Sequence, residues 1–126
     1  MLIVEDDGDT RAALVELLDR AGYSAAEARD GYEALRLLRA GLKPFAMFID
    51  LTMPEMDGRA FCDACGADPA FASTWRVIVS GLDEHAAARC NAHAYVPKPI
   101  NEEAIVELLE QLHLRRAGWT HQELSA

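Results

Sequence analysis

The chain has 126 residues, 51% of them hydrophobic and 26% charged, which is typical of one soluble globular domain. Its net charge of −9 argues against a general nucleic-acid binder, which would carry a basic face. No apolar run approaches the ~20 residues of a membrane span, the first residues do not resemble a signal peptide, and the three cysteines form no disulfide framework. We therefore expect the protein in the reducing cytoplasm.

The chain begins with a predicted strand and helix. Residues 2–4 are apolar and β-prone, and three acids follow them directly: Glu5, Asp6 and Asp7. The next segment has apolar residues at the spacing of an amphipathic helix, namely Ala13, Leu14, Leu17, Leu18 and Ala21. Asp9 or Thr10 is predicted to cap this helix, and Gly22 is predicted to end it.

The second strand and helix are less regular. Residues 23–28 are rich in alanine and indicate a strand only weakly. Asp30 and Glu33 have the spacing of a capping box, with Asp in the cap position. The helix that they introduce is expected to stop at Gly41, because glycine readily adopts the left-handed conformation that ends many helices.

The strongest strand signal is the apolar run that ends at Asp50. The five residues before it, 45–49, are apolar, and Pro44 and Pro54 bound the run. This pattern is typical of a central strand that is buried on both faces. Open α/β sheets bind ligands at the carboxyl ends of their strands, and a buried carboxylate needs a partner for its charge. Asp50 is therefore the first candidate site residue.

The second half of the chain continues the alternation of strands and helices. The predicted elements are a helix at 59–64, a strand at 76–80 ending in Ser80, a short helix at 83–91, a strand at 94–96 leading to Lys98, and a helix capped by Asn101. In the first of these helices, Ala60, Phe61 and Cys65 are expected to face inward. Five strand–helix units imply an α/β fold with a mostly parallel sheet and helices on both faces.

Polar residues follow four of the five predicted strands. Since the carboxyl ends of parallel strands share one edge of a sheet, these residues should form one site, and they are Glu5, Asp6, Asp7, Asp50, Thr52, Ser80 and Lys98. Several carboxylates that lie close together require a cation, and oxygen ligands suit Mg²⁺. A carboxylate beside Mg²⁺, an ammonium and a hydroxyl is equipped to accept a phosphoryl group. Any one of these residues alone would be an ordinary solvated side chain.

The motifs that carry these residues resemble the receiver domain of two-component response regulators. They are the segments 4–7, 49–58, 79–81 and 95–99, which occur in the order of that family. The resemblance implies a flavodoxin-like, doubly wound, five-stranded parallel sheet of order 2-1-3-4-5. It covers a receiver domain at 1–114 and leaves a C-terminal tail at 115–126, in which a linker helix could start.

The resemblance also implies a role for each site residue. Asp50 would be the phosphoacceptor. Asp6 would be the main acidic Mg²⁺ ligand, helped by Glu5, Asp50 and the backbone carbonyl of Thr52, with Mn²⁺ as a substitute metal. Asp7 would lie just outside the ligand shell.

Three residues near the end of the chain complete the implied switch. Ser80 resembles the switch hydroxyl, and Lys98 the lysine that contacts the phosphoryl group. Tyr95 resembles the aromatic residue that reorients when the switch hydroxyl moves. The peptide bond between Lys98 and Pro99 is commonly cis in this family.

The function implied is a phosphorylation-activated signalling switch, not an enzyme, although it would assist its own phosphorylation and dephosphorylation. The phosphoryl donor would be a sensor histidine kinase, a phosphotransfer protein or an acyl phosphate. A downstream protein or a tethered output domain would read the switch, with a homodimer as one form, and without direct contact to nucleic acid or membrane. The segment between Ser80 and Lys98 is about one helical turn shorter than is usual, which leaves the output geometry open.

Three other functions fit the sequence less well. A phosphohydrolase that uses Asp50 as nucleophile would usually have a second acid where this chain has Thr52. A pseudo-receiver scaffold would not need the full set of acids with Ser80 and Lys98. A flavodoxin is disfavoured because the acids after the first strand would repel the cofactor phosphate.

The cysteines and one histidine have spacings that also occur in zinc sites. Cys62 and Cys65 form a C-x-x-C pair, and Cys90 and His93 form a C-x-x-H pair. We favour core packing for the first two cysteines, because free cysteine is among the most buried residue types.

Overall fold

The computed structural model describes residues 1–51, 56–81 and 92–116. Five parallel strands form one sheet in the order β2-β1-β3-β4-β5. The strands are β1 (Leu2–Val4), β2 (Ala26–Ala28), β3 (Ala46–Asp50), β4 (Trp75–Ser80) and β5 (Ala94–Pro97). The helices are α1 (Gly8–Arg20), α2 (Gly31–Arg39), α3 (Gly58–Ala67) and α5 (Glu102–Arg116). The fold class and strand order predicted from the sequence are therefore confirmed.

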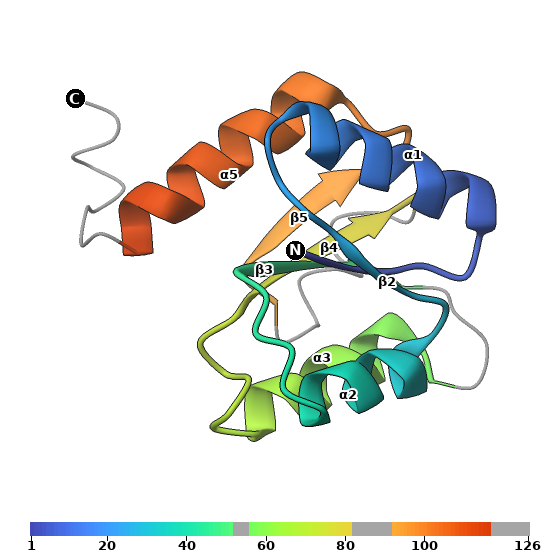
Figure 1. The fold of residues 1–126 in the computed structure, drawn as a ribbon, viewed down its shortest axis with the longest axis vertical. Helices are drawn as coiled ribbons and strands as arrows, with labels where there is room; N and C mark the ends of the chain where they lie inside the picture. Colours follow the sequence, from blue (N-terminus) through green and yellow to red (C-terminus); the bar gives the residue numbers. More distant parts are fainter. Residues whose placement is uncertain (52–55, 82–91, 117–126) are drawn as a thin grey trace.

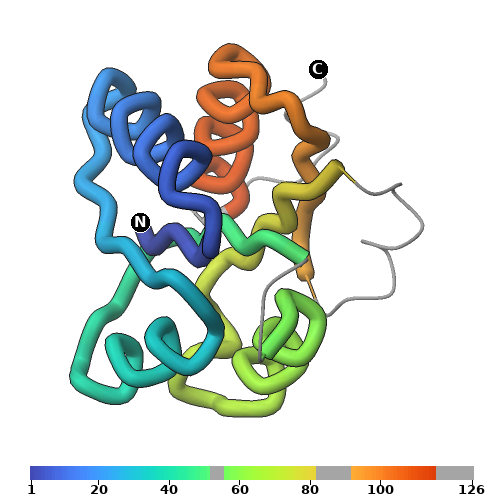
Figure 2. The backbone as a smooth tube through the Cα atoms, turned by 90° about the vertical axis from the view of Figure 1, so that its right-hand side faces the viewer, coloured from blue at the N-terminus to red at the C-terminus, as the bar shows by residue number. Residues whose placement is uncertain are grey.

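Helices cover the sheet on both faces, with α1 and α5 on one side and α2 and α3 on the other (Figures 1 and 2). Alternate residues of the central strands supply the two cores. In β3, Phe48 packs with Leu14 of α1 and Leu109 of α5, whereas Met47 and Ile49 belong to the opposite core. The strands that are buried on both faces explain why the sequence shows continuous apolar runs.

The helix ends agree in part with the sequence predictions. The carboxylate of Asp30 accepts a hydrogen bond from the backbone N–H of Glu33 at 2.8 Å, which confirms the predicted cap of α2. Gly22 and Gly41 follow the ends of α1 and α2 with φ angles of 93° and 113°, a conformation that costs glycine little. The prediction that Asp9 or Thr10 caps α1 is wrong, since Asp7 is the N-cap and accepts from the backbone N–H of Thr10 at 3.1 Å.

Three other element predictions need correction or lie outside the described residues. Helix α3 is longer than the predicted 59–64, and Ala60 is exposed, because its inward positions are Gly58, Phe61, Cys62 and Cys65. Strand β2 occupies only the last three residues of the weak signal at 23–28. The short helix predicted at 83–91 falls outside the described residues. None of the helices within the described ranges is both long enough and apolar enough to cross a membrane.

Candidate functional site

Four of the polar residues predicted at the strand ends lie at one edge of the sheet. Glu5 follows β1, Asp50 is the last residue of β3, Ser80 is the last residue of β4, and Lys98 follows β5. These four strands are neighbours in the sheet, and their parallel pairing aligns their carboxyl ends. The pairing of Val4 with Ile49 and of Ser80 with Pro97 fixes this alignment.

Lys98 links the two buried carboxylates of the site. Its Nζ atom lies 2.8 Å from Oε1 of Glu5 and 3.6 Å from Oδ1 of Asp50. Burial lowers the pKa of Lys98, but the hydrogen bond to Glu5 and the charges of Asp50 and Glu5 outweigh that effect and raise it above its ordinary value. Lys98 therefore stays charged in the folded protein and offsets part of the negative charge at this edge.

Glu5 is the carboxylate of the site whose charged form is most disfavoured by its surroundings. It is only 2% exposed, and burial, together with the hydrogen bond and charge of Asp50, raises its pKa to about 7. Its Oε1 atom faces Lys98, while its Oε2 atom is buried and has no hydrogen-bond partner among the described residues. A buried carboxylate oxygen without a donor is costly unless it neutralises or meets a cation.

The acidic residues also have the arrangement that a metal ion requires. One carboxylate oxygen each from Glu5, Asp6 and Asp50 lie within 4.8 Å of one another. These oxygen donors, together with the Oε2 atom of Glu5 that meets no donor in the described part of the chain, fit a hard divalent cation such as Mg²⁺. The backbone carbonyl of Thr52 lies outside the described residues.

Asp7 is held in a different way. Its exposed carboxylate accepts hydrogen bonds from the backbone N–H and the hydroxyl of Thr10, and these hydrogen bonds lower its pKa. Its carboxylate is not among the three that converge at the strand ends. Asp7, the third acid of the run, therefore serves as the N-cap of α1.

Comparisons with known proteins agree with this geometry. Residues 1–110 match the family described as "Response regulator receiver domain". This chain belongs to the response regulator receiver domain family. It is 38% identical to Response regulator MprA of Mycobacterium sp. (strain KMS), covering 94% of this chain and 51% of that protein. It is 31% identical to Transcriptional regulatory protein CpxR of Escherichia coli (strain K12), covering 98% of this chain and 52% of that protein.

Solved structures show the same likeness. The signal receiver domain of a signal transduction histidine kinase from Syntrophus aciditrophicus superposes with a TM-score of 0.81 at 30% identity, over 88% of this chain and 86% of that one. The receiver domain described here spans about half the length of the curated relatives above.

In the receiver domain, the side chain of Tyr95 contacts the backbone of Ser80. Ser80 is buried at the end of β4, and the Tyr95 hydroxyl donates to its backbone carbonyl at 3.3 Å. The same carbonyl accepts from the backbone N–H of Lys98 at 2.9 Å. The peptide bond between Lys98 and Pro99 is cis, as the resemblance implied.

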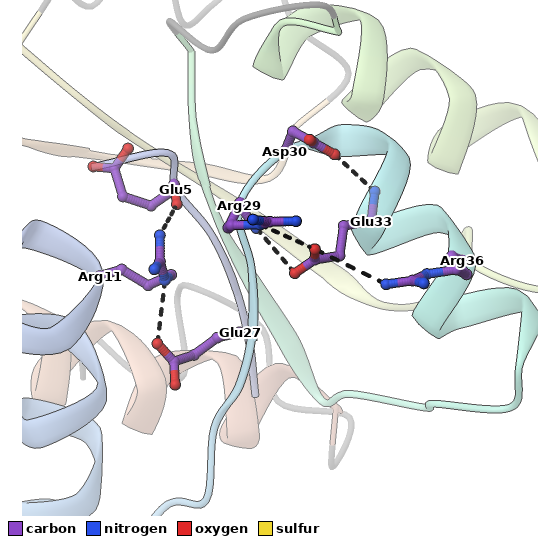
Figure 3. A network of polar contacts seen from close by, with 7 residues as sticks. All are labelled: Glu5, Arg11, Glu27, Arg29, Asp30, Glu33 and Arg36. Atoms are coloured by element: carbon purple, nitrogen blue, oxygen red, sulfur yellow. Dashed lines mark hydrogen bonds and ion pairs between the residues drawn. The ribbon is translucent and has the colours of Figure 1, made fainter. Parts of the chain in front are cut away.

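Two residues that support the site were not assigned a role from the sequence. Arg11 of α1 donates from Nη1 to the backbone carbonyl of Glu5 at 2.8 Å and pairs through Nε with Glu27 at 3.2 Å (Figure 3). Gly58 begins α3 so close to β3 that an added Cβ would overlap the backbone oxygen of Asp50. No local signal reveals the first contact, because it joins segments that are separate in the sequence.

The described residues of the cysteine and histidine pairs pack in the core or bond the backbone. Cys62 and Cys65 are fully buried in the core between the sheet and its α2–α3 layer, and burial raises the pKa of Cys65 to about 11. His93 accepts the backbone N–H of Arg76 through Nδ1 at 3.0 Å, and Cys90 lies outside the described residues. The preference for core packing of Cys62 and Cys65 is confirmed.

Proposed function

We propose that this receiver domain is a phosphorylation-activated switch in which Asp50 accepts the phosphoryl group. The observation that carries the proposal is the Lys98 ammonium between the carboxylates of Glu5 and Asp50, with Ser80 at the adjacent strand end. This arrangement brings a carboxylate nucleophile, a cation and a hydroxyl donor to one edge of the sheet.

In the proposed reaction, a carboxylate oxygen of Asp50 attacks the phosphorus of a phosphohistidine or of a small acyl phosphate. A new P–O bond forms, and the bond from phosphorus to the leaving nitrogen or oxygen breaks with its electron pair on the leaving group. The product is an acyl phosphate on Asp50, which water later hydrolyses. Lys98 would neutralise one phosphoryl oxygen, and the Ser80 hydroxyl would donate to another.

A divalent cation belongs to this proposal. Mg²⁺, or Mn²⁺ in its place, would be held by Glu5, Asp6, Asp50 and the backbone carbonyl of Thr52, with Asp7 outside that shell. When bound, it would supply charge neutralisation for the transferring phosphoryl oxygens. The buried Oε2 atom of Glu5, which has no hydrogen-bond partner within residues 1–51, 56–81 and 92–116, supports this assignment.

The proposed readout runs through the last strands and helices. Tyr95 and Lys98 both bond the backbone carbonyl of Ser80, so a shift of Ser80 toward the phosphoryl group would change the contacts of β5. Such an exchange between two contact sets is the two-state element that a phosphorylation switch requires. The domain would assist its own phosphorylation and dephosphorylation without turning over a separate substrate.

The partners and boundaries are proposed on the same basis. We expect a sensor histidine kinase or phosphotransfer protein as donor, and a downstream protein or a tethered output domain as reader, with a homodimer as one possible form. The receiver domain would occupy residues 1–114 and the tail 115–126. The cytoplasm is the expected location.

Phosphorylation with acetyl phosphate and Mg²⁺ tests the proposal. Intact-mass spectrometry should show the gain of one phosphoryl group, which Asp50→Asn should abolish and the exposed control Asp63→Asn should retain. No mass gain in the unaltered chain would favour a pseudo-receiver scaffold. Repeated turnover of p-nitrophenyl phosphate would favour a phosphohydrolase.

A further inference from the structure

The positive charges of this acidic chain are concentrated around α2. Arg29, Arg36, Arg39 and Lys43 lie within one 15-residue segment, which contains only two of the 21 acids. Both of those acids, Asp30 and Glu33, are engaged in local contacts. The segment is therefore the basic pole of a molecule whose net charge is −9.

Three exposed side chains lie along one face of α2, and a fourth comes just before the helix. Tyr32, Arg36 and Arg39 have spacings of four and three residues, which places neighbouring members on one face of a helix. Arg29 precedes the N-cap Asp30 and is joined to the helix through Glu33. Tyr32 is 56% exposed, and it is one of two large hydrophobic side chains that the described residues leave on the surface. Tyr and Arg are the residue types most enriched among the energetically dominant contacts of protein interfaces.

Glu33 holds two of these arginines in place. The Nε atom of Arg29 and the Nη2 atom of Arg36 lie 3.3 Å and 3.9 Å from Oε2 of Glu33, and Figure 3 shows the two guanidinium groups approaching that carboxylate. The Glu33 side chain is 20% exposed, whereas those of Arg29 and Arg36 are 73% and 77% exposed. Because a guanidinium has five N–H donors, each arginine keeps donors that face solvent.

A cavity of about 360 Å³ begins where α2 ends. Its lining includes Leu38, Leu42, Lys43 and Pro44 from the end of α2 and the following turn, and Phe71 from the turn after α3. Ser73 and Thr74 also line the cavity, so apolar side chains share its walls with two hydroxyls and the cationic side chain of Lys43.

We propose that the α2 face, defined as Arg29, Tyr32, Arg36, Arg39 and the adjoining cavity, binds an acidic segment of a partner protein. Carboxylates of that segment pair with the arginines, and one bulky apolar side chain enters the cavity. The arginines lie beside an exposed tyrosine and a cavity with apolar side chains in its lining, a combination that suits a protein segment carrying both carboxylates and an apolar side chain. The proposal goes beyond phosphoryl transfer and does not depend on Asp50.

A labelled synthetic peptide provides the test. The probe is an alanine-based helix with four glutamates on one face and a phenylalanine at one end, and its binding is followed by fluorescence anisotropy at low ionic strength. Arg36→Glu should weaken binding about tenfold, and Tyr32→Ala about fivefold or more. Amide shifts in two-dimensional NMR should concentrate in residues 29–43.

Matched controls separate this surface from general charge effects. Arg59→Glu makes the same change in net charge at an exposed position of α3 and should change the affinity less than about twofold. Asp50→Asn should bind the peptide normally, so failure of phosphorylation and failure of this proposal are distinguishable. Equal binding of a glutamine version of the peptide, tighter binding of single-stranded DNA, or equal weakening by Arg59→Glu would each overturn the proposal.

Discussion

Among single residues, Glu5 is the one whose burial most clearly alters the charge of the site. One oxygen of its carboxylate accepts a hydrogen bond from the Lys98 ammonium. The other oxygen is buried and meets no donor among the described residues. Burial and the neighbouring Asp50 raise its pKa to about 7. Without a metal ion, the site therefore holds a proton near neutral pH that an ordinary glutamate would have lost.

This raised pKa predicts a dependence of stability on pH in EDTA. Between the ordinary value of 4.5 and about 7, the folded protein binds the Glu5 proton and the unfolded chain does not. The free energy of unfolding should therefore fall as pH rises through this window, by up to roughly 3 kcal/mol. Urea unfolding should show this slope, and Glu5→Gln should flatten it. An unchanged slope in Glu5→Gln, equal to that of the exposed Glu107→Gln, would contradict the assignment.

Among the helices, α1 and α3 begin with the same residue pattern but differ in what their first residue contacts. Each helix has an Asp N-cap followed by Gly, with Asp7 before Gly8 and Asp57 before Gly58. An added Cβ at Gly8 would meet only the end of the Arg11 side chain, at an ordinary contact distance of 3.9 Å. Gly58, in contrast, packs against the backbone of Asp50 and donates its N–H to the carbonyl of Leu51 at 3.0 Å. The start of α3 thus positions the end of β3.

The contrast predicts different costs for the same substitution. Gly58→Ala places a methyl group against the Asp50 backbone and should destabilise the domain by about 1–3 kcal/mol or more. It should also slow phosphorylation, because the carboxylate of Asp50 moves with its backbone. Gly8→Ala should be neutral or slightly stabilising, by up to about 1 kcal/mol. Denaturant unfolding of both variants measures the difference, and equal costs would argue against close packing at Gly58.

At the scale of the whole molecule, the site ties separate parts of the chain together. Glu5 and Asp50 come from strands that are joined through α1, β2 and α2, and Lys98 comes from the far end of the sheet. A cation held by these acids would bind the folded chain and not the unfolded one. Its binding is therefore coupled to the stability of the entire domain.

Mg²⁺ is accordingly predicted to raise the melting temperature. At a concentration of about 100 times its Kd, it should add about 2.7 kcal/mol to the free energy of unfolding. Asp6→Asn should remove most of this gain, and Asp63→Asn, at an exposed position of α3, should retain it. Thermal unfolding in EDTA and in rising Mg²⁺ makes the comparison. A gain that survives Asp6→Asn would place the ion elsewhere.

The parallel sheet and the composition of its edge follow from local sequence patterns. Continuous apolar runs require strands that are buried on both faces, and the residue after each run is local information. Asp50, Ser80 and Lys98 could therefore be placed at strand ends before any contact was known.

How those strand ends meet depends on the packing of the whole chain. The 2.8 Å contact between Lys98 and Glu5 joins residues 93 positions apart, and the support of Glu5 by Arg11 depends on how α1 lies against the sheet. The engagement of Asp7 as a helix cap and the outward position of Ala60 depend on shifts of one to three residues. Periodicity does not resolve such shifts, because helix starts and inward faces are set by packing of the whole chain and not by local pattern alone.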